Sequence, residues 1–328
     1  MRVDEELRRQ HLQVMIDMGR LHRFLVIGRG KSGTTWLGRI LNSHPSVFLR
    51  GERKLVEKTA PYTPILRHLL NDRVMGVWGQ HTSFRLGLQP ERMGPALWRL
   101  VDDYLLAASL VSLKVDVASL THLGDKLALL RGRDVQDILP NLDLAYPGYR
   151  AIHIVRDGRD VALSMFGRRH DFRAYNTYYA ARQWEQYVEA GREHGRGLSP
   201  SQFLELRYED MIGDQKAALR RICAFLDEPY SDDLLEYRKP QGPGKTPLLQ
   251  KPIQASNKDK WKKEMSPRQI RVFESAAAES LRKFGYSLTT DGTRLPLALR
   301  AAYRWHNALN THWYRAFGPK KRAWVRPS

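Results

Sequence analysis

The sequence predicts a three-layer α/β fold in which a central parallel sheet is flanked by helices. Two segments share a short apolar run, a charged or glycine-rich turn and an amphipathic helix: RFLVIGRGKSGTTWLGRIL at 23–41 and RAIHIVRDGRDVALSMF at 150–166. Each apolar run suits a buried parallel strand, and apolar residues at helical spacing follow each turn. Because ligands of such folds bind at the carboxyl ends of the strands, both turns should lie on the ligand side.

Further segments continue this alternation of strands and helices. Two more apolar stretches, SLVSLKVD at 109–116 and QFLELRYED at 202–210, predict strands. Apolar residues at helical spacing predict a surface helix near the N-terminus and further helices at 95–108, 134–143, 174–193, 215–226 and 267–284. The chain therefore reads as one α/β domain with short extensions at both ends.

Composition indicates a globular protein that attracts anions. The chain of 328 residues is 42% hydrophobic and carries 54 Lys and Arg against 35 Asp and Glu, for a formal net charge of +19. Such a charge attracts nucleic acid, an acidic membrane surface or polyanionic small ligands. The single cysteine, Cys223, cannot form an internal disulfide, which favours a reducing, cytoplasmic location. No stretch of the sequence approaches the roughly 20 apolar residues that span a bilayer.

The first turn, GRGKSGTT at 28–35, has the features of a phosphate-binding loop with a displaced lysine. A Walker A loop carries its lysine after the last glycine, whereas Lys31 comes two residues before Gly33. Glycines allow successive amide N–H groups to converge on one anion, and the following helix adds its positive end. Lys31 adds a full charge, and hydrogen bonds can come from the hydroxyls of Ser32, Thr34 and Thr35. These features predict an anion site in a P-loop-type fold.

The second turn, RDGRD at 156–160, predicts another oxyanion site. Arg156 ends the strand, and Ser164 and Arg168 are four residues apart on one face of the following helix. Two anion sites at one sheet edge indicate a ligand with two separated phosphates. The alternative is that Arg156 pairs with Asp157 or Asp160.

Together, the motifs KSGTTWLGRILNSHP and IHIVRDGRDVALSMF resemble those of sulfotransferases that use 3'-phosphoadenylyl sulfate (PAPS). The likeness covers about residues 22–288 and is closest to tyrosylprotein sulfotransferases and related bacterial enzymes. It implies a sulfotransferase domain at 22–288, an N-terminal helical extension at 1–21 and a basic, aromatic C-terminal helix or tail at 289–328. It further implies a 5'-phosphosulfate site at Lys31, Ser32, Gly33, Thr34 and Thr35, and 3'-phosphate and nucleotide contacts at Arg156, Ser164 and Arg168.

The same resemblance nominates residues outside the two turns. Glu52, in HPSVFLRGERKLVEK, falls where those enzymes place the catalytic base, and His122 is the alternative base. Lys126, in HLGDKL, matches a lysine that would act with Lys31 on the leaving phosphate and sulfuryl oxygens. Tyr208, in LRYEDM, matches a residue beside the adenine. The late loop LLQKPIQASNKDKWKKEMSP, which closes over the nucleotide in that family, nominates Lys251 and Lys260.

The implied reaction is in-line transfer of a sulfuryl group from PAPS to an acceptor hydroxyl, with 3',5'-adenosine bisphosphate (PAP) as the product and no metal required. The acceptor class stays open among a glycan, a lipid-linked sugar and a tyrosine or other phenol. A P-loop nucleotide or small-molecule kinase is the nearest alternative, with Asp116 as a weak candidate magnesium ligand. A basic nucleic-acid-binding protein is the second alternative.

The C-terminal segment at 294–328 holds eight Lys and Arg and no acidic residue, interleaved with aromatic residues. Its apolar residues at helical spacing are Leu299, Ala302, Tyr303, Leu309, Trp313 and Ala316. This spacing predicts a C-terminal helix that docks by its apolar face and exposes a basic face. Peripheral attachment to an anionic membrane is the alternative, whereas binding of nucleic acid is not expected.

Overall fold

The computed structural model describes residues 5–50, 99, 103, 106–107, 110–111, 113–129, 146–167, 172–236 and 257–318. The chain divides into two compact units. The sheet unit comprises Met1–Ile154 and Ala190–Gln254, and the helical unit comprises Val155–Glu189 and Ala255–Ser328. The predicted limits of the two terminal extensions stay predictions.

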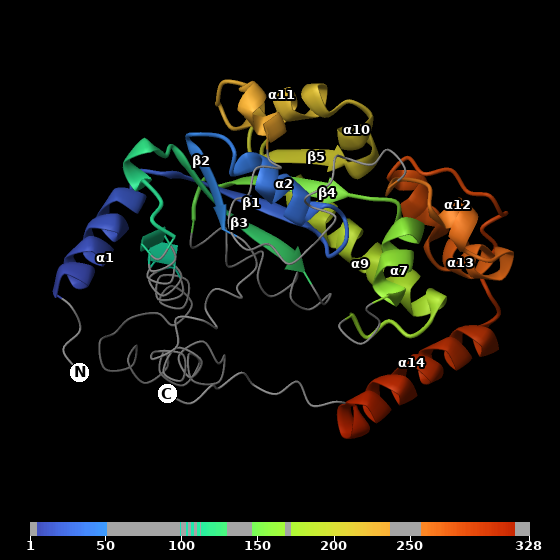
Figure 1. Cartoon of the computed structure of the whole chain (residues 1–328). Helices are drawn as coiled ribbons and strands as arrows, with labels where there is room; N and C mark the ends of the chain where they lie inside the picture. The colour runs from blue at the N-terminus through green and yellow to red at the C-terminus, as the bar shows by residue number, and fades with distance from the viewer. Residues whose placement is uncertain are drawn as a thin grey trace. The chain divides into compact units, whose positions relative to one another are not determined.

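The sheet unit is built on five strands in the order β2-β3-β1-β4-β5 (Figure 1). Their bounds are β1 (His22–Arg29), β2 (Val47–Arg50), β3 (His122–Leu129), β4 (Arg150–Val155) and β5 (Phe203–Arg207). The central strand β1 runs parallel to both β3 and β4, and β2 runs parallel to β3. The predicted α/β fold with a central parallel sheet is thus confirmed.

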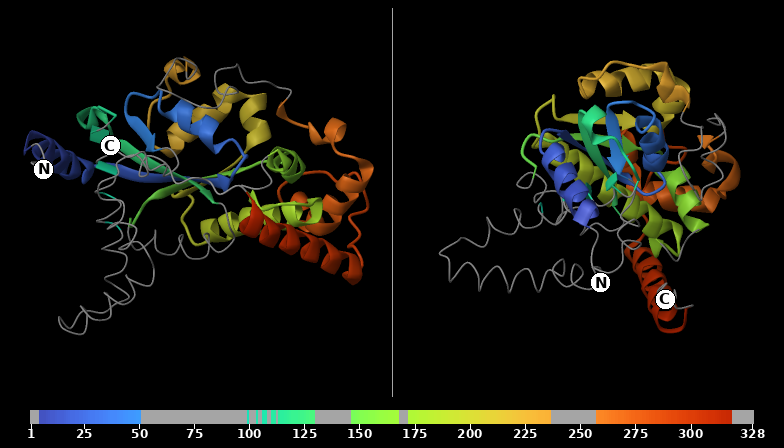
Figure 2. Two further views of the ribbon diagram at one scale, coloured as in Figure 1. Left: turned by 60° about the horizontal axis from the view of Figure 1, so that its bottom comes forward. Right: turned by 60° about the vertical axis from the view of Figure 1, so that its left-hand side comes forward.

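Helices α2 (Thr34–Leu41), α10 (Tyr208–Gly213) and α11 (Gln215–Phe225) lie on one face of this sheet (Figures 1 and 2). Phe24 and Val26 point from β1 into this layer, where they pack with Leu37 and Ile40 of α2 and with other buried apolar side chains. Cys223 of α11 lies in the same core, and burial raises the pKa of its thiol to about 11. The cysteine is therefore a packing residue.

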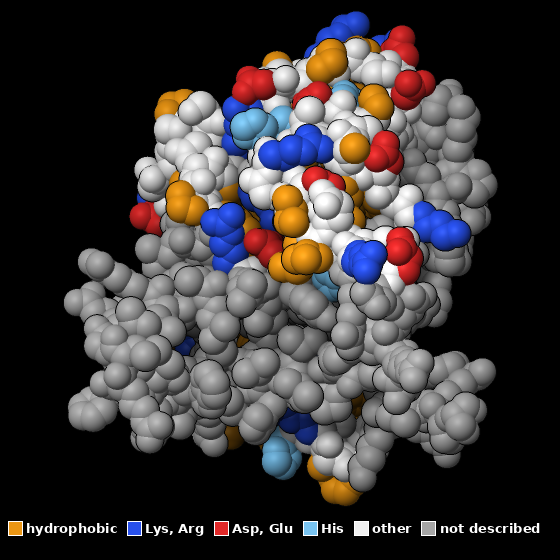
Figure 3. Space-filling model, turned by 90° about the vertical axis from the view of Figure 1, so that its left-hand side faces the viewer, with side chains coloured by type: hydrophobic (Ala, Val, Ile, Leu, Met, Phe, Trp, Pro, Cys, Tyr) orange, Lys and Arg blue, Asp and Glu red, His pale blue; other side chains and the backbone are white. Residues whose placement is uncertain are grey.

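Helix α1 (Glu5–Met18) packs on a second, smaller core of the sheet unit. Met18 and Leu21 are buried with Leu110, Val117 and other apolar residues in a separate small core. On the face that carries α1, the described hydrophobic, basic and acidic side chains are interspersed (Figure 3). The predicted N-terminal helix is confirmed.

The helical unit contains α7 (Gly158–Phe166), the start of α9 (Thr177–Arg196), α12 (Trp261–Glu264), α13 (Pro267–Lys283) and α14 (Leu297–Phe317). Its core centres on Trp184, whose ring centroid lies 6.0 Å from that of Phe273 and 6.2 Å from that of Phe284. Within the described ranges, no helix combines the length and apolar character needed to cross a bilayer.

Most predicted elements are found close to their expected bounds, but the prediction of a strand at 109–116 is wrong. Residues 110 and 111 are helical, residues 113 and 114 form a turn, and the strand is β3, at His122–Leu129. Leu110 instead belongs to the core that covers α1. The short strand β2 was not predicted, and the predicted helix at 134–143 lies outside the described residues.

The C-terminal helix forms as predicted, but the prediction that it docks by its apolar face is wrong. Leu309 is 63% exposed and Trp313 is 60% exposed, whereas the buried residue of α14 is Asn307. Polar contacts of Asn307 hold the helix, and its large apolar side chains are exposed.

Candidate active site

The first turn leaves β1 at its carboxyl end and curls before α2 begins. Lys31 has a φ of 84° and Gly33 a φ of 94°, so two residues of the loop adopt the left-handed conformation. The N–H of Ser32 donates to the carbonyl of Arg29 at 3.0 Å. Ser32 is fully buried, and its Oγ has no hydrogen-bond partner among the described residues. A buried hydroxyl of this kind in a cradle-shaped loop fits a ligand that accepts hydrogen bonds.

Tyr208, the first residue of α10, lies against this loop. A Cβ on Gly33 would stand 2.6 Å from Cδ2 of the Tyr208 ring, so glycine is required there by space as well as by φ. The ring of Trp36 in α2 meets Tyr208 edge-on at 6.0 Å. The structure therefore brings together the loop and the aromatic residue nominated to lie beside the adenine.

Lys126 reaches the same place from β3. It is level with Val26 in the parallel register, so its side chain shares the face of the sheet that α2 covers. Its Nζ donates to Oγ1 of Thr35 at 2.8 Å, and the residue is 7% exposed. A buried cation thus stands at the first turn of α2, where the helix carries no acidic residue. Cations and the helix N-terminus together favour an anion.

Side-chain contacts next to Lys126 hold β3 against the neighbouring strands β2 and β1. Arg50, the last residue of β2, forms an ion pair with Asp125, its partner in the register. Phe24 covers Gly124 so closely that a Cβ there would lie 2.3 Å from the ring. Glu52, the nominated base, follows Arg50 by two residues and lies outside the described residues.

The alternative base, His122, is at the wrong end of β3. It is level with His22 in β1, six residues before Gly28, which corresponds to about 20 Å along a strand. Its Nδ1 lies 2.8 Å from Oε1 of Glu228, and burial lowers its pKa. This geometry contradicts a role for His122 at the loop.

The magnesium ligand considered for a kinase is also misplaced. Asp116 accepts the N–H of Ala118 at 3.1 Å and caps the short helix η2 (Val117–Ser119) before β3 begins. It therefore lies on the amino-terminal side of the sheet, away from the loop at 28–35. Asp116 therefore cannot serve as the magnesium ligand that the kinase hypothesis requires at the loop.

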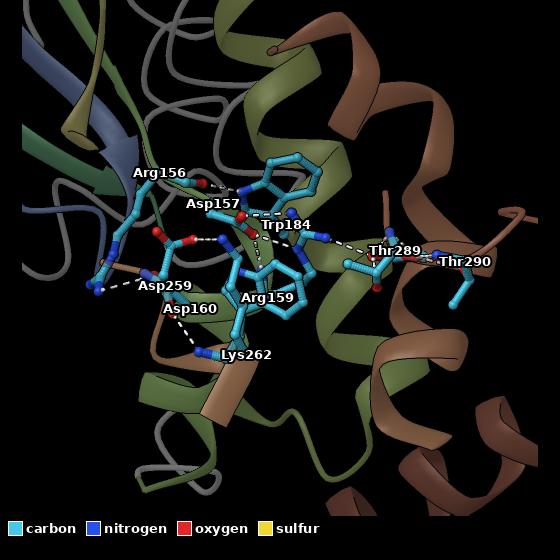
Figure 4. Close-up of polar contacts among 11 residues, drawn as sticks. Arg156, Asp157, Arg159, Asp160, Trp184, Asp259, Lys262, Thr289 and Thr290 are labelled. Atoms are coloured by element: carbon cyan, nitrogen blue, oxygen red, sulfur yellow. Dashed lines mark hydrogen bonds and ion pairs between the residues drawn. The ribbon is translucent and has the colours of Figure 1, made fainter. Parts of the chain in front are cut away.

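The second turn forms a network of charged groups in the helical unit (Figure 4). The guanidinium of Arg159 donates to both oxygens of Asp157, at 3.0 and 2.7 Å, and to Glu274 at 2.6 Å. It stacks on Trp261 at 3.6 Å. Burial opposes its charge, but Asp157 and Glu274 raise its pKa. Arg159 thus pairs with Asp157 at the start of α7 and with Glu274 of α13.

Arg156, unlike Arg159, donates to a backbone carbonyl. Its Nη2 donates to the carbonyl of Asn257 at 2.6 Å and lies 3.9 Å from Oδ2 of Asp160. Asp160 accepts the backbone N–H groups of Asp259 at 2.9 Å and Trp261 at 3.0 Å, and burial raises its pKa. Asp160 therefore fixes the segment that carries Asn257 beside Arg156.

This second cluster includes some of the nominated residues. Lys260 lies in the segment that Asp160 holds, immediately before α12, and Ser164 is half-buried on α7. Arg168 and Lys251 lie outside the described residues. The role of Asp160 was not predicted, because its partners are backbone amides about a hundred residues later in the chain.

Comparisons with known proteins identify the family to which the chain belongs. The model of the sulfotransferase family matches residues 23–232, and the chain belongs to that family. A protein-tyrosine sulfotransferase of Drosophila melanogaster is 24% identical over 225 residues, which cover 66% of this chain and 40% of that protein. An uncharacterized protein of Aquifex aeolicus is 27% identical over 256 residues, which cover 73% of this chain and 30% of that protein. The matched region thus spans well under half the length of these two relatives.

Among solved structures, the sulfotransferase domain of the Synechococcus PCC 7002 olefin synthase has a TM-score of 0.54 at 22% identity, with 82% of this chain and 96% of that chain covered. The sulfotransferase domain from the curacin biosynthetic pathway has a TM-score of 0.51 at 18% identity, with 82% and 99% covered. These two likenesses bear on the fold alone.

Proposed function

We propose that this chain transfers a sulfuryl group from PAPS to an acceptor hydroxyl. The observation that carries the proposal is the buried Ser32 Oγ, which has no partner among the described residues and lies in a loop flanked by Lys31 and Lys126. We assign the 5'-phosphosulfate to this loop, at residues 28–35. We assign the 3'-phosphate to Arg156 and Ser164.

The proposed chemistry depends on charge stabilisation. Negative charge builds on the leaving phosphate oxygen during sulfuryl transfer, as in phosphoryl transfer. Lys31, Lys126 and the N-terminus of α2 would stabilise that charge in a buried setting, where fixed charges and dipoles are most effective. Thr35 holds Lys126 in position through the 2.8 Å hydrogen bond.

A general base must accept the proton of the acceptor hydroxyl. We propose Glu52 for this role, because it matches the base of the related enzymes and His122 lies at the other end of its strand. The acceptor is a compound with a free hydroxyl, either a sugar or a phenol such as tyrosine.

The experiment follows release of PAP from PAPS while a panel of sugars, phenols and tyrosine peptides is offered as acceptors. We expect turnover with at least one class, and a loss of about a hundredfold in Glu52→Gln, since removing a general base costs that much or more. Glu193→Gln serves as the control, because Glu193 is 69% exposed and pairs with Arg196 on the surface. Equal turnover by Glu52→Gln and the wild type would show that Glu52 is not the base.

A further inference from the structure

Helix α14 is attached to the helical unit by its polar side. Oδ1 of Asn307 accepts the N–H of Tyr175 at 2.8 Å, and its Nδ2 donates to the carbonyl of Arg173 at 3.0 Å. Asn176 donates to the carbonyl of Tyr303 at 2.8 Å. Asn307 is 3% exposed, so these contacts define the inner face of the helix.

The opposite side of α14 is apolar and exposed. Trp305, Leu309, Trp313 and Phe317 recur every four residues and are exposed by 69%, 63%, 60% and 74%. At about 100° per residue, Trp305, Leu309 and Trp313 lie on the side of the helix away from Asn307. Solvent exposure of so many large side chains in a row is uncommon and marks an interaction surface.

The charges along the helix indicate what covers this surface. No Asp or Glu occurs in α14, while Arg304 and Arg315 are exposed on one flank of the helix, between the face of Asn307 and the apolar stripe. A helix with Trp and Leu on one face and arginines on its flank suits the boundary between acyl chains and anionic headgroups. A second copy of α14 would bring arginines together without any acidic residue of that helix to neutralise them.

We propose that α14 binds the surface of an anionic lipid membrane through Trp305, Leu309 and Trp313. The helix lies in the plane of the membrane, with its indole and leucine side chains at the acyl boundary and Arg304 and Arg315 at the headgroups. Because the face that docks α14 to the protein is polar, membrane binding requires no rearrangement of Asn307 and its partners. This inference is independent of the proposed sulfuryl transfer.

The test is co-sedimentation of the full chain with vesicles of phosphatidylcholine alone or mixed in equal parts with phosphatidylglycerol. We expect the wild type to pellet with the mixed vesicles and far less with phosphatidylcholine. The triple variant Trp305→Ser, Leu309→Ser, Trp313→Ser should partition at least about tenfold less, since burial of each such side chain favours binding by more than a decade. The variant Leu12→Ser, Ile16→Ser is the matched control, because both residues are exposed, by 60% and 62%, on α1.

A second pair of variants tests the electrostatic part. Arg304→Ser, Arg315→Ser should remove most of the preference for phosphatidylglycerol, whereas Arg268→Ser, Arg271→Ser on the exposed side of α13 should leave it unchanged. Thermal unfolding of each variant is measured alongside, and unchanged midpoints are expected because the replaced side chains are exposed. Equal pelleting by the triple variant and the wild type overturns the proposal. A wild-type dimer that ignores vesicles and dissociates in the triple variant overturns it in favour of self-association.

Discussion

At Gly33 the backbone needs a left-handed conformation in a place that has no room for a side chain. Its φ of 94° disfavours any other residue, and a Cβ would stand 2.6 Å from Tyr208. The conformation of the loop therefore requires glycine at this position.

We therefore expect Gly33→Ala to lower the free energy of unfolding by about 1–3 kcal/mol, from strain and displacement of the ring. Denaturant unfolding measures this change. Gly213→Ala is the control, because nothing lies within 4 Å of a Cβ at that position. A Gly33→Ala protein as stable as Gly213→Ala would show that the loop relaxes freely.

Glu205 of β5 provides a second prediction for a single residue. Its carboxylate accepts hydrogen bonds from His153 at 3.1 Å and from Arg192 at 2.5 Å. Burial opposes its ionisation, but these two partners lower its pKa to about 2. Because the pKa is depressed in the folded state, the stabilisation is present above the ordinary pKa of 4.5 and disappears as the pH falls toward 2.

Glu205→Gln should accordingly lose about 2–3 kcal/mol of stability at neutral pH and almost none near the folded-state pKa. Unfolding measured across this range gives the profile. Glu193→Gln, at an exposed ion pair, should follow the wild type at every pH. A loss that is constant with pH would indicate a packing effect instead of ionisation.

At the scale of elements, the segment before α12 depends on one carboxylate. Asp160 accepts the N–H groups of Asp259 and of Trp261, the first residue of α12, and Asn257 in turn accepts a hydrogen bond from Arg156. We expect Asp160→Ala to release this segment and to weaken PAP binding about tenfold, a typical cost for losing hydrogen bonds to a charged group, while binding of adenosine 5'-monophosphate is unchanged.

Calorimetric titration of both nucleotides measures this difference. Asp259→Ala is the matched control, since the Asp259 side chain is 49% exposed and pairs with Lys262 only 2.9 Å away on the surface. If Asp259→Ala weakens PAP binding as much as Asp160→Ala, the carboxylate of Asp160 has no special role in positioning Arg156.

The elements that could be predicted are those whose determinants are local. The turn at 28–35 follows from its own glycines and from the apolar runs on either side. Strand β3 was missed because its polar residues look unsuited to a buried strand. Thr35 and Arg50, which pair with Lys126 and Asp125 in the folded chain, lie far away in the sequence.

The docking of α14 was missed for a related reason. Apolar spacing predicted the helix, but not the face that is covered. Asn307 fixes that face through backbone groups of Arg173 and Tyr175, more than a hundred residues earlier. Hydrogen bonds to distant backbone leave no pattern in the sequence.

At the scale of the whole molecule, the two nominated phosphate sites belong to different compact units. The loop at 28–35 is in the sheet unit, and Arg156 and Ser164 are in the helical unit. The proposed use of PAPS predicts that Lys31 affects binding of any nucleotide with a 5'-phosphate. It predicts that Arg156 affects only a nucleotide that also carries a 3'-phosphate.

The most direct test is calorimetric titration of PAP and adenosine 5'-monophosphate into the wild type, Lys31→Ala and Arg156→Ala. We expect the wild type to prefer PAP, Lys31→Ala to weaken both nucleotides, and Arg156→Ala to weaken PAP alone by about ten- to a hundredfold, as expected for a charged contact. Arg196→Ala, at an exposed ion pair, should change neither affinity. Equal affinity of the wild type for the two nucleotides, or no binding of PAP, would contradict the assignment.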